Sequence, residues 1–495
     1  MPIRTPALPS LPRARVAGVP ALARVRAVLG AALLAGLAAG CAELPTRPSS
    51  GPIADIASDV APASSARLSS TYANANARLE TAERVWRMIG ERFYDPAMNG
   101  VDWNAARWRH LPRALAATSD AEFYRVLKDM VAELHDSHTL VLTPREALDR
   151  RRFMTSRTGL TLTYVEGRIA VAEVDPASPA ASAAVAPGEI VAAINGKRVD
   201  AGFVRAAIAD PETLTVDVAA GDGPETLPDD ARDAERVRVL RAVQRLVRPV
   251  DYVGMPAPLR LELLDEFGAA RRVELKAQTL LRPPMAEHFW LDGGVLVLKF
   301  NRFLPEVRDR IEVALDAAVA ARGIIIDLRG NGGGLLETFR WFCGQFVADE
   351  RIVMRSVKRE REQPGAQSVS FVRIWPPRTD QSRPPLLQPL AVLVDGRTAS
   401  AGELTAVTLA EQRGALLVGE PTCGCVVGVP AEYVLPDRGG LRISETGFFS
   451  ARGQPMEGRP TVPEIRVQPR LADLRAGRDV VLETAHRHLL ARLPR

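Results

Sequence analysis

Ser400 lies in a segment that is typical of a buried strand, a tight turn and a helix. The apolar run Leu390-Ala391-Val392-Leu393-Val394 is followed by Asp395-Gly396-Arg397-Thr398-Ala399-Ser400-Ala401-Gly402-Glu403. This pattern places the Ser400 hydroxyl in the first turn of the helix, where the helix dipole stabilises developing negative charge. A serine at a helix start is most often an N-cap, so this segment alone favours a cap over a nucleophile.

A second strand-turn-helix segment precedes it in the chain. The buried run Gly323-Ile324-Ile325-Ile326-Asp327-Leu328 leads into Arg329-Gly330-Asn331-Gly332-Gly333-Gly334 and a helical pattern from Leu335. Such a glycine-rich turn can aim backbone N–H groups at an anion. A Walker loop is excluded because no Gly-Lys-Ser/Thr follows, and the spacing does not fit a dinucleotide site.

Taken together, the two segments resemble motifs of the S41-type serine peptidases, which include carboxy-terminal processing proteases and tricorn core proteases. Two further stretches match: Val418-Gly419-Glu420-Pro421-Thr422, and the closing Met456-Glu457-Gly458 with Val462-Pro463-Glu464-Ile465. The resemblance covers about residues 73 to 470. It implies hydrolysis of peptide bonds through an acyl-enzyme on Ser400, with a peptide or unfolded protein as substrate. It implies no metal or organic cofactor.

The general base cannot be the one that the processing proteases use. Their lysine lies in Gly-Glu-x-Thr-x-Gly-Lys, whereas this chain has Gly419-Glu420-Pro421-Thr422-Cys423-Gly424-Cys425. Cys425 occupies the lysine position, and no lysine follows Lys358. Cys425 is a poor base for a hydroxyl, because its thiolate would itself be the better nucleophile. A Ser-Lys dyad of this design is therefore excluded.

The tricorn-like branch uses serine, histidine and glutamate, and this chain has matching residues. Glu133-Leu134-His135-Asp136-Ser137-His138 corresponds to the Glu-Leu-x-x-Ser-His pattern of that branch. The resemblance implies that His138 is the general base and that Glu457 orients it. The alternatives are a structural histidine at a helix end and a glutamate that braces a turn. A metal pair of His135 and His138 lacks a third ligand at a sensible spacing, so no metal site is predicted.

The predicted oxyanion hole follows from the same resemblance. The N–H of Ala401 and the N–H of Gly333 or Gly334 would hold the negative oxygen of the tetrahedral intermediate. Losing one such donor typically lowers the rate about 100- to 1000-fold.

Residues 157–282 resemble a PDZ domain that carries an insertion at about 219–256. The resemblance rests on Gly159-Leu160-Thr161-Leu162, on Ser178-Pro179-Ala180-Ala181, and on Pro187-Gly188-Glu189-Ile190 with Ile194-Asn195-Gly196. The segment Gly159-Leu160-Thr161-Leu162 is predicted to receive a peptide as an added strand. The alternative is a structural β-layer with a closed groove.

The length of 495 residues suggests about three domains. We expect a multidomain α/β protein with a helical N-terminal domain at 73–156, where apolar residues recur at helical spacing. The PDZ-like module at 157–282 follows. An α/β serine peptidase core of the ClpP/crotonase-like type, with a mostly parallel sheet, is expected at 283–475, and a C-terminal helix at 476–495.

Residues 1–40 are typical of a bacterial lipoprotein signal. Five arginines precede an apolar run from Val28 to Ala39, which is too short to span a bilayer. Leu37-Ala38-Ala39-Gly40-Cys41 resembles the lipobox, so Cys41 is the predicted site of lipidation and membrane attachment. Residues 41–72 are predicted to be a flexible tether. Ala42 favours sorting to the outer membrane, so we expect a lipid-anchored protein of the cell envelope on the periplasmic face.

The alternative for the N-terminus is an ordinary secretory signal with a chance cysteine. Elsewhere the sequence leaves Cys343, Cys423 and Cys425. Cys423 and Cys425 are too close in sequence to pair comfortably, while a bridge from Cys343 to either of them fits an oxidising compartment. The net charge is only +5 and the basic residues are scattered, so no nucleic-acid partner is expected.

Two rival functions remain at this stage. Thr398-x-Ser400-x-Gly402 is close to the nucleophile elbow of α/β-hydrolase-type esterases, in which His486 or His488 would be the late histidine. The missing lysine suggests instead a catalytically inactive, lipid-anchored, peptide-binding scaffold. The sequence carries no signal for an oligomeric state.

Overall fold

The computed structural model describes residues 63–493, with gaps at 153, 201, 204–205, 207–238, 241–242, 244–257, 282, 361–364, 378–382 and 452. The predicted signal, Cys41 and most of the predicted tether lie outside the described residues, as does most of the predicted insertion. The first helix, α1, begins at Ala63, ahead of the expected domain boundary at 73. None of the helices in these described ranges is both long and apolar enough to cross a bilayer.

The N-terminal region is helical, as the spacing of its apolar residues predicts. Its helices are α1 (Ala63–Arg92), η1 (Met98–Gly100), α2 (Trp103–Leu115), α3 (Asp120–Ala132) and α4 (Pro144–Arg151). Asp102 caps α2 by accepting from the Ala105 N–H, and Ser119 caps α3 in the same way. The buried face of α3 includes Phe123, Val126, Leu127 and Met130.

Strands from far along the chain complete the core of this helical region. The short strand β1 (Leu140–Leu142) pairs antiparallel with β19 (Gly440–Arg442), which pairs with β18 (Glu432–Val434). Leu435, Leu441 and Ile443 are buried in the same apolar cluster as the helices. This packing fixes the turn between α3 and β1, and that turn contains His138.

A β-rich module follows, and we use this name for β3 to β8. Its elements are β3 (Leu160–Val165), β4 (Arg168–Val174), α5 (Pro179–Ser182), β5 (Ile190–Ile194), β6 (Lys197–Arg198), β7 (Leu259–Leu264) and β8 (Ala270–Leu275). The strand order is β3-β4-β5-β7-β8, with β6 paired to β5. Val239 and Val243, from the predicted insertion, are buried in the core of the module. A ribbon of β2 (Met154–Arg157) and β9 (Gln278–Leu281) adjoins it.

The core sheet is mostly parallel, in the order β10-β11-β12-β15-β16-β21. Its strands are β10 (Ala286–Leu291), β11 (Val295–Phe300), β12 (Gly323–Asp327), β15 (Leu390–Val394), β16 (Leu416–Gly419) and β21 (Ile465–Arg466), of which only β10 is antiparallel. Every residue of β12 and β15 is buried, as expected for strands that are covered on both faces.

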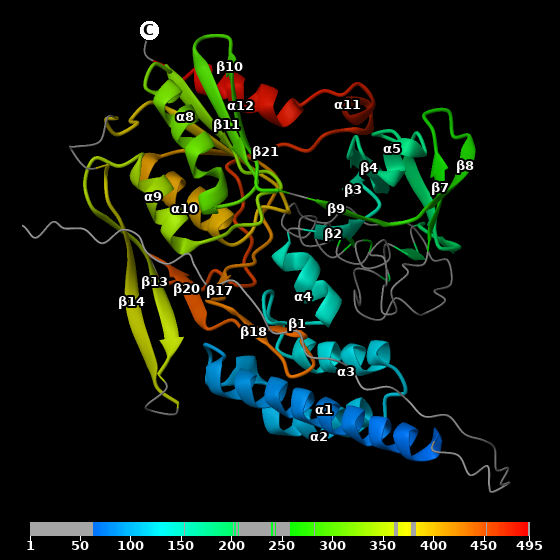
Figure 1. Ribbon diagram of the computed structural model, residues 1–495. Helices are drawn as coiled ribbons and strands as arrows, with labels where there is room; N and C mark the ends of the chain where they lie inside the picture. Colours follow the sequence, from blue (N-terminus) through cyan, green and yellow to red (C-terminus); the bar gives the residue numbers. More distant parts are fainter. Residues whose placement is uncertain are drawn as a thin grey trace, which may run out of the picture. The chain divides into compact units, whose positions relative to one another are not determined.

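Helices cover both faces of this sheet (Figure 1). Alternate residues of the strands pack against α8 (Arg308–Ala318), α9 (Leu336–Gly344) and α10 (Ala401–Arg413) on one face. The other residues of the same strands pack against α12 (Val480–Leu490). The predicted multidomain α/β fold with a helical N-terminal region is confirmed.

The remaining elements surround this core. A second sheet has the order β14-β13-β20-β17, from β13 (Arg351–Arg359), β14 (Gln367–Ile374), β17 (Val427–Gly428) and β20 (Thr446–Ser450). The 3-10 helix η2 (Pro305–Val307) precedes α8. The short helix α11 (Leu471–Arg475) packs on the β-rich module, because Leu471 is buried with Val165, Ala170 and Ile190.

Phe342 is the centre of an aromatic group that joins α9 to the sheet. Its ring lies 5.1 Å from that of Phe300, 5.8 Å from that of Phe303 and 5.3 Å from that of Phe346. We expect Phe342→Ala to destabilise the fold by about 3 to 5 kcal/mol, because it leaves a cavity and removes aromatic contacts. Phe371→Ala is the control, since Phe371 is 54 % exposed. Equal guanidinium midpoints for the two variants would contradict this assignment of the core.

Candidate active site

The parallel pairing of β12 with β15 brings the two predicted turns to one edge of the sheet. Ile324 lies opposite Leu390, and Asp327 lies opposite Leu393. The turns are also joined by hydrogen bonds: Gly330 donates its N–H to Asp395 Oδ1 at 2.9 Å, and Thr398 donates its hydroxyl to the Leu328 carbonyl at 2.8 Å. The glycine-rich turn and the Ser400 turn therefore form one structural unit.

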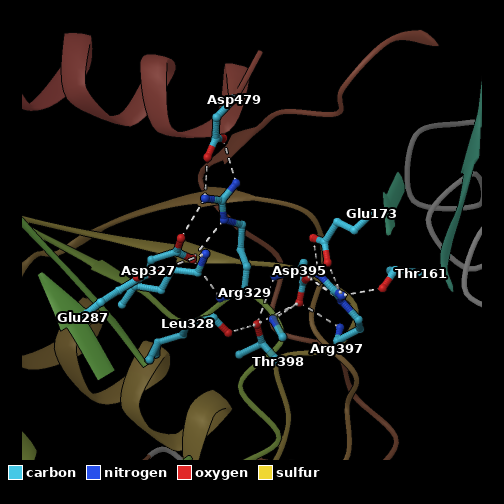
Figure 2. A network of polar contacts seen from close by, with 12 residues as sticks. Thr161, Glu173, Glu287, Asp327, Leu328, Arg329, Asp395, Arg397, Thr398 and Asp479 are labelled. Atoms are coloured by element: carbon cyan, nitrogen blue, oxygen red, sulfur yellow. Dashed lines mark hydrogen bonds and ion pairs between the residues drawn. The ribbon is translucent and has the colours of Figure 1, made fainter. Parts of the chain in front are cut away.

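Two arginines brace this unit from outside (Figure 2). Arg329 forms charge-assisted hydrogen bonds with Asp327, on its own strand, and with Asp479, the N-cap of α12, at distances from 2.7 to 2.9 Å. Because both carboxylates accept from the same guanidinium, the first turn is fixed to the helix behind the sheet.

Arg397 connects the Ser400 turn to the β-rich module (Figure 2). Its guanidinium contacts Asp395 at 2.9 Å, Glu173 of β4 at 3.1 Å and the Thr161 hydroxyl of β3 at 3.4 Å. Burial alone would raise the pKa of Asp395, but Arg397 and the Gly330 N–H hold it below its ordinary value. Asp395 therefore stays ionised and keeps Arg397 in place, three residues before Ser400.

Ser400 has an unusual backbone conformation at the start of α10. Its φ is 53° and its ψ is −123°, a region that residues with a β-carbon rarely adopt. The Ser400 N–H donates to the Cys425 carbonyl at 2.9 Å, and the Ser400 carbonyl accepts the Leu404 N–H. The Ser400 side chain forms no capping hydrogen bond with α10, although the residue occupies the N-cap position. The simple capping role is therefore not observed.

The glycine-rich turn lies directly against Ser400. A β-carbon at position 333 would lie only 2.6 Å from Ser400 Cβ and 2.8 Å from the Ala401 nitrogen. The Gly333 N–H is itself donated to Asn331 Oδ1 at 2.9 Å. Ala401 begins the helix, so its N–H has no partner within α10. Among the predicted oxyanion donors, Ala401 directly follows Ser400, and the exposed Gly334 follows Gly333 in the glycine-rich turn.

His138 lies in a turn that one carboxylate organises. Asp136 Oδ1 accepts the N–H of Thr139 at 2.6 Å and the hydroxyl of Ser444 at 2.7 Å. It also accepts the N–H of His138 at 3.2 Å. Asp136 thereby holds the His138 turn to the segment that follows β19. No hydrogen bond between His138 and Ser400 is present in the described part of the chain.

Ser137, which the sequence analysis did not select, lies between His138 and Glu457. The Ser137 hydroxyl lies 2.6 Å from His138 Nδ1, and the Ser137 N–H donates to Glu457 Oε1 at 3.0 Å. Glu457 Oε2 accepts the Val426 N–H at 2.6 Å. Glu457 therefore contacts the histidine turn through Ser137, and no direct bond between the Glu457 carboxylate and the imidazole is seen among the described residues.

The surroundings of His138 favour a neutral imidazole. Burial lowers its pKa to about 4, and the positive charges of Arg442 and Arg150 act in the same direction, against the opposing effect of Asp136. Burial also raises the pKa of Glu457, and the nearby Asp136 adds to this, whereas the contacts with Ser137 and Val426 oppose it. Near pH 7 the imidazole is therefore neutral, and its unprotonated ring nitrogen can accept a proton.

Glu403 is a second residue that the sequence analysis left without a role. It is fully buried, and it accepts hydrogen bonds from the N–H of Gly424 at 2.9 Å, the N–H of Cys425 at 2.8 Å and the Thr422 hydroxyl. Burial raises its pKa to about 7, although these hydrogen bonds act in the other direction. Glu403 positions the loop whose Cys425 carbonyl accepts the Ser400 N–H. An acid in the first turn of a buried helix was the available signal.

The cysteines correct the expectation from the sequence. Cys423 and Cys425 form a disulfide with each other, and Cys343 is free and buried. The proposed bridge from Cys343 is therefore wrong, because this cysteine lies inside the core beside Thr405. The loop that Glu403 holds brings Cys423 and Cys425 together despite their short separation. The Cys425 sulfur, in a disulfide, is not available as a base or a nucleophile.

The two late histidines are not arranged as the base of an esterase. His486 Nε2 bonds to the Asp292 carbonyl at 2.7 Å, and His488 is exposed on α12. Within the described ranges, no group of three or more histidine, cysteine or acidic side chains is arranged to hold a metal ion. The site therefore consists of the Ser400 turn, the glycine-rich turn and the His138 turn.

Comparisons with known proteins show what two parts of the chain are similar to. Residues 294–467 match the family described as peptidase family S41, and residues 81–132 match the tricorn protease C1 domain. A solved structure of mature CPAF complexed with lactacystin has a TM-score of 0.59 at 13 % identity, over 84 % of this chain and 98 % of that one. At that identity the likeness concerns the fold alone, and it supports the observed architecture.

Two curated relatives are also similar. The tricorn protease homolog 2 of Streptomyces coelicolor is 26 % identical over 82 % of this chain and 31 % of that protein. The chloroplastic carboxyl-terminal-processing peptidase 2 of Arabidopsis thaliana is 25 % identical over 73 % of this chain and 63 % of that protein. The chain thus spans less than two thirds of the length of either relative. The match to peptidase family S41 thus covers residues 294–467, the part of the chain that contains both turns of the site and Glu457.

Proposed function

We propose that this protein is an endopeptidase that hydrolyses peptide bonds of peptides or unfolded proteins, with Ser400 as its nucleophile. The observation that carries the proposal is the conformation of Ser400, which has a positive φ at the start of α10 and faces the glycine-rich turn. Strained residues of this kind persist where the surroundings hold them, and they concentrate at functional sites.

In the proposed reaction, His138 accepts the hydroxyl proton of Ser400 while the Ser400 oxygen attacks the scissile carbonyl. The carbonyl oxygen becomes an oxyanion, which the N–H groups of Ala401 and Gly334 stabilise. His138 then passes its proton to the leaving amine, so that the peptide bond breaks and an acyl-enzyme remains. Water, deprotonated by His138, attacks the ester, releases the acid product and restores the Ser400 hydroxyl.

Ser137 and Glu457 serve His138 in this scheme. The short contact from the Ser137 oxygen to His138 Nδ1 fixes the orientation of the ring, and in the scheme Nδ1 donates to this oxygen so that Nε2 accepts the Ser400 proton. Glu457 holds the Ser137 backbone and supplies negative charge near the imidazolium that forms during attack. The orienting acid thus acts through a hydroxyl residue, which modifies the direct contact that the sequence suggested.

The edge strand β3 supports binding of an extended substrate. Among the described strands, β3 pairs only with β4 and is therefore an edge strand, the kind of strand to which an extended peptide can add, although Gln468 donates to its Tyr164 carbonyl at 3.4 Å. Gly159, at its start, has a φ of 86°, and a β-carbon there would lie 2.0 Å from Ser178 Cβ. Glycine therefore allows the close packing that positions Leu160, Thr161 and Leu162 along the edge.

The two alternative functions are addressed in different ways, the esterase by the position of its histidine and the scaffold by chemical labelling. An esterase with a late histidine is disfavoured because His486, on α12, is bonded to the Asp292 carbonyl between β10 and β11. An inactive peptide-binding scaffold would fail to react with a fluorophosphonate probe, which modifies only an activated serine. Labelling of Ser400 in the wild-type protein separates the enzyme from the scaffold.

We expect Ser400→Ala and His138→Ala each to lower kcat on an unfolded protein substrate at least about 1000-fold, because members of such a unit act together. Glu457→Gln should cost less, since the orienting acid is usually the least costly residue to lose. Cys425→Ala should keep most of the activity. Fluorophosphonate labelling and peptide release measure these effects.

Ser370→Ala, an exposed serine on β14, is the matched control and should behave as wild type. An active Ser400→Ala variant would sink the proposed mechanism. An active His138→Ala variant would contradict His138 as the general base, and an inactive Cys425→Ala variant would show that the disulfide loop is needed to position Ser400.

The activity should persist below the pH at which an ordinary histidine protonates. Because burial and the two arginines lower the pKa of His138 to about 4, the imidazole remains a base as the pH falls through 6.5. We expect kcat/KM to lose half its value nearer pH 4 than pH 6.5. Between these values the unfolded state binds more protons at this residue, so the protein becomes less stable as the pH is lowered. Circular dichroism must therefore accompany the assay. A midpoint at 6.5 in folded protein would contradict this assignment.

We also propose that the protein is lipid-anchored through Cys41 in the bacterial cell envelope, at the periplasmic face of the outer membrane. The lipobox-like Leu37-Ala38-Ala39-Gly40-Cys41 is the support for this proposal. Cys41→Ser should abolish acylation, because the thiol carries the diacylglycerol, and should move the protein out of the detergent phase. Unchanged partitioning of the variant would contradict the anchor.

A further inference from the structure

Arg442 is a half-buried guanidinium close to the His138 turn. It lies on the central strand β19, opposite Leu140 of β1 and Glu432 of β18, and Leu140 follows His138 by two residues. The Arg442 Nε is buried and has no hydrogen-bond partner. No hydrogen bond or ion pair of this side chain is found among the residues that the structure describes. An arginine offers five donors, so this arrangement leaves strong binding capacity unused.

Positive charge exceeds negative charge around Arg442. Glu432 is the carboxylate that lies opposite, and it is already contacted by Arg151 at 3.2 Å and by Arg150 at 3.9 Å. Burial lowers the pKa of Arg442 to about 10, and the like charges of Arg150 and Arg302 add to that effect, against Glu432. The carboxylate opposite Arg442 is therefore already engaged by two other guanidiniums.

The arginine cluster, by which we mean Arg150, Arg302 and Arg442, extends to the glycine-rich turn. A β-carbon at Gly332 would lie 1.8 Å from Arg302 Nη1, so the guanidinium rests on the backbone of that turn. The next residue, Gly333, is the one that faces Ser400. The cluster therefore approaches both parts of the site, with Arg302 beside the Ser400 side and Arg442 beside the His138 side.

Resting on the proposed function, we propose that the arginine cluster is a subsite for a carboxylate of the peptide substrate within one or two residues of the scissile bond. A desolvated guanidinium binds a carboxylate through two parallel hydrogen bonds, which is stronger than a contact in water. An extended peptide advances about 3.3 Å per residue, so a group that contacts Arg302 beside the turn belongs to a residue near the cut. Both acidic side chains and a terminal carboxylate supply this chemistry.

A purely structural role for Arg442 predicts a different pattern. An arginine with a structural role donates to carbonyls or carboxylates of neighbouring segments, as Arg413 at the end of α10 does to the carbonyls of Phe346 and Gln388. Arg442 makes no such bond in the described part of the structure, although Glu432 is its cross-strand neighbour. Its loss would then affect all substrates equally, whereas loss of a subsite affects only those that carry a carboxylate.

The experiment begins with the wild-type protein and an unfolded protein whose cleavage sites are mapped by mass spectrometry. One mapped peptide is then made in four forms, with Glu or Gln beside the cut and with a free or an amidated C-terminus. We expect the best carboxylate form to exceed its neutral counterpart about tenfold or more in kcat/KM, mainly through KM. The Glu/Gln arm and the terminus arm assign the source of the carboxylate.

Arg442→Gln should lower kcat/KM for the carboxylate peptide far more than for the neutral peptide, so that the ratio falls to about one, and Arg442→Lys should retain part of the preference. Arg145→Gln is the matched control, because Arg145 lies on the same helix as Arg150, is exposed and pairs with Asp149 at 3.6 Å. The control should keep the wild-type ratio. Thermal melting verifies that each variant folds.

Binding to a Ser400→Ala background keeps the inference testable without turnover. Fluorescence anisotropy of the four labelled peptides should show the same preference in Kd, lost on adding Arg442→Gln. Absence of hydrolysis by the wild type, with the Kd preference intact, would reject the proposed peptidase activity but keep the subsite. Equal Kd and kcat/KM for carboxylate and neutral peptides in the wild type, or an equal loss for all peptides in Arg442→Gln, would overturn the subsite.

Discussion

The side-by-side pairing of β12 and β15 is the constraint on which the site depends. These strands are parallel and buried on both faces, so their carboxyl ends must open at the same edge of the sheet. The glycine-rich turn and the Ser400 turn therefore meet without any loop having to reach across the molecule. The hydrogen bonds from Gly330 to Asp395 and from Thr398 to Leu328 then fix the position of one turn relative to the other. The positive φ of Ser400 can persist only because this frame is rigid.

Buried acidic side chains stabilise these two turns through different kinds of partner. Asp395 and Asp327 are nearly enclosed, and each is matched by an arginine that also reaches a more distant element. Glu403 is paired with no cation in the described part of the chain, and its oxygens accept from backbone N–H groups and a threonine hydroxyl. Such groups are stable only when every partner is present, which makes the geometry around Ser400 resistant to small displacements.

The sequence could predict whatever depends on local order. Apolar runs followed by glycine-rich turns indicated β12 and β15 with their helices, and the confirmed multidomain α/β fold follows from such patterns. The sequence did not predict roles for Ser137, Glu403 and Arg442, because the role of each depends on which distant segment faces it. Glu457 contacts Ser137, and Arg442 lies opposite Leu140, only through packing of segments far apart in the chain. The Cys423 to Cys425 pairing was missed for a related reason, since the loop held by Glu403 determines it.

The core of the helical N-terminal region has a consequence for the order of events during synthesis. Leu435, Leu441 and Ile443 belong to that core, and Ser444 anchors the carboxylate that shapes the His138 turn. A ribosome releases the helices long before it releases these residues. The emerging chain therefore carries an incomplete core and an unformed histidine turn until the last strands appear. Contacts of such long sequence separation form slowly, so the catalytic machinery is assembled late and as a whole.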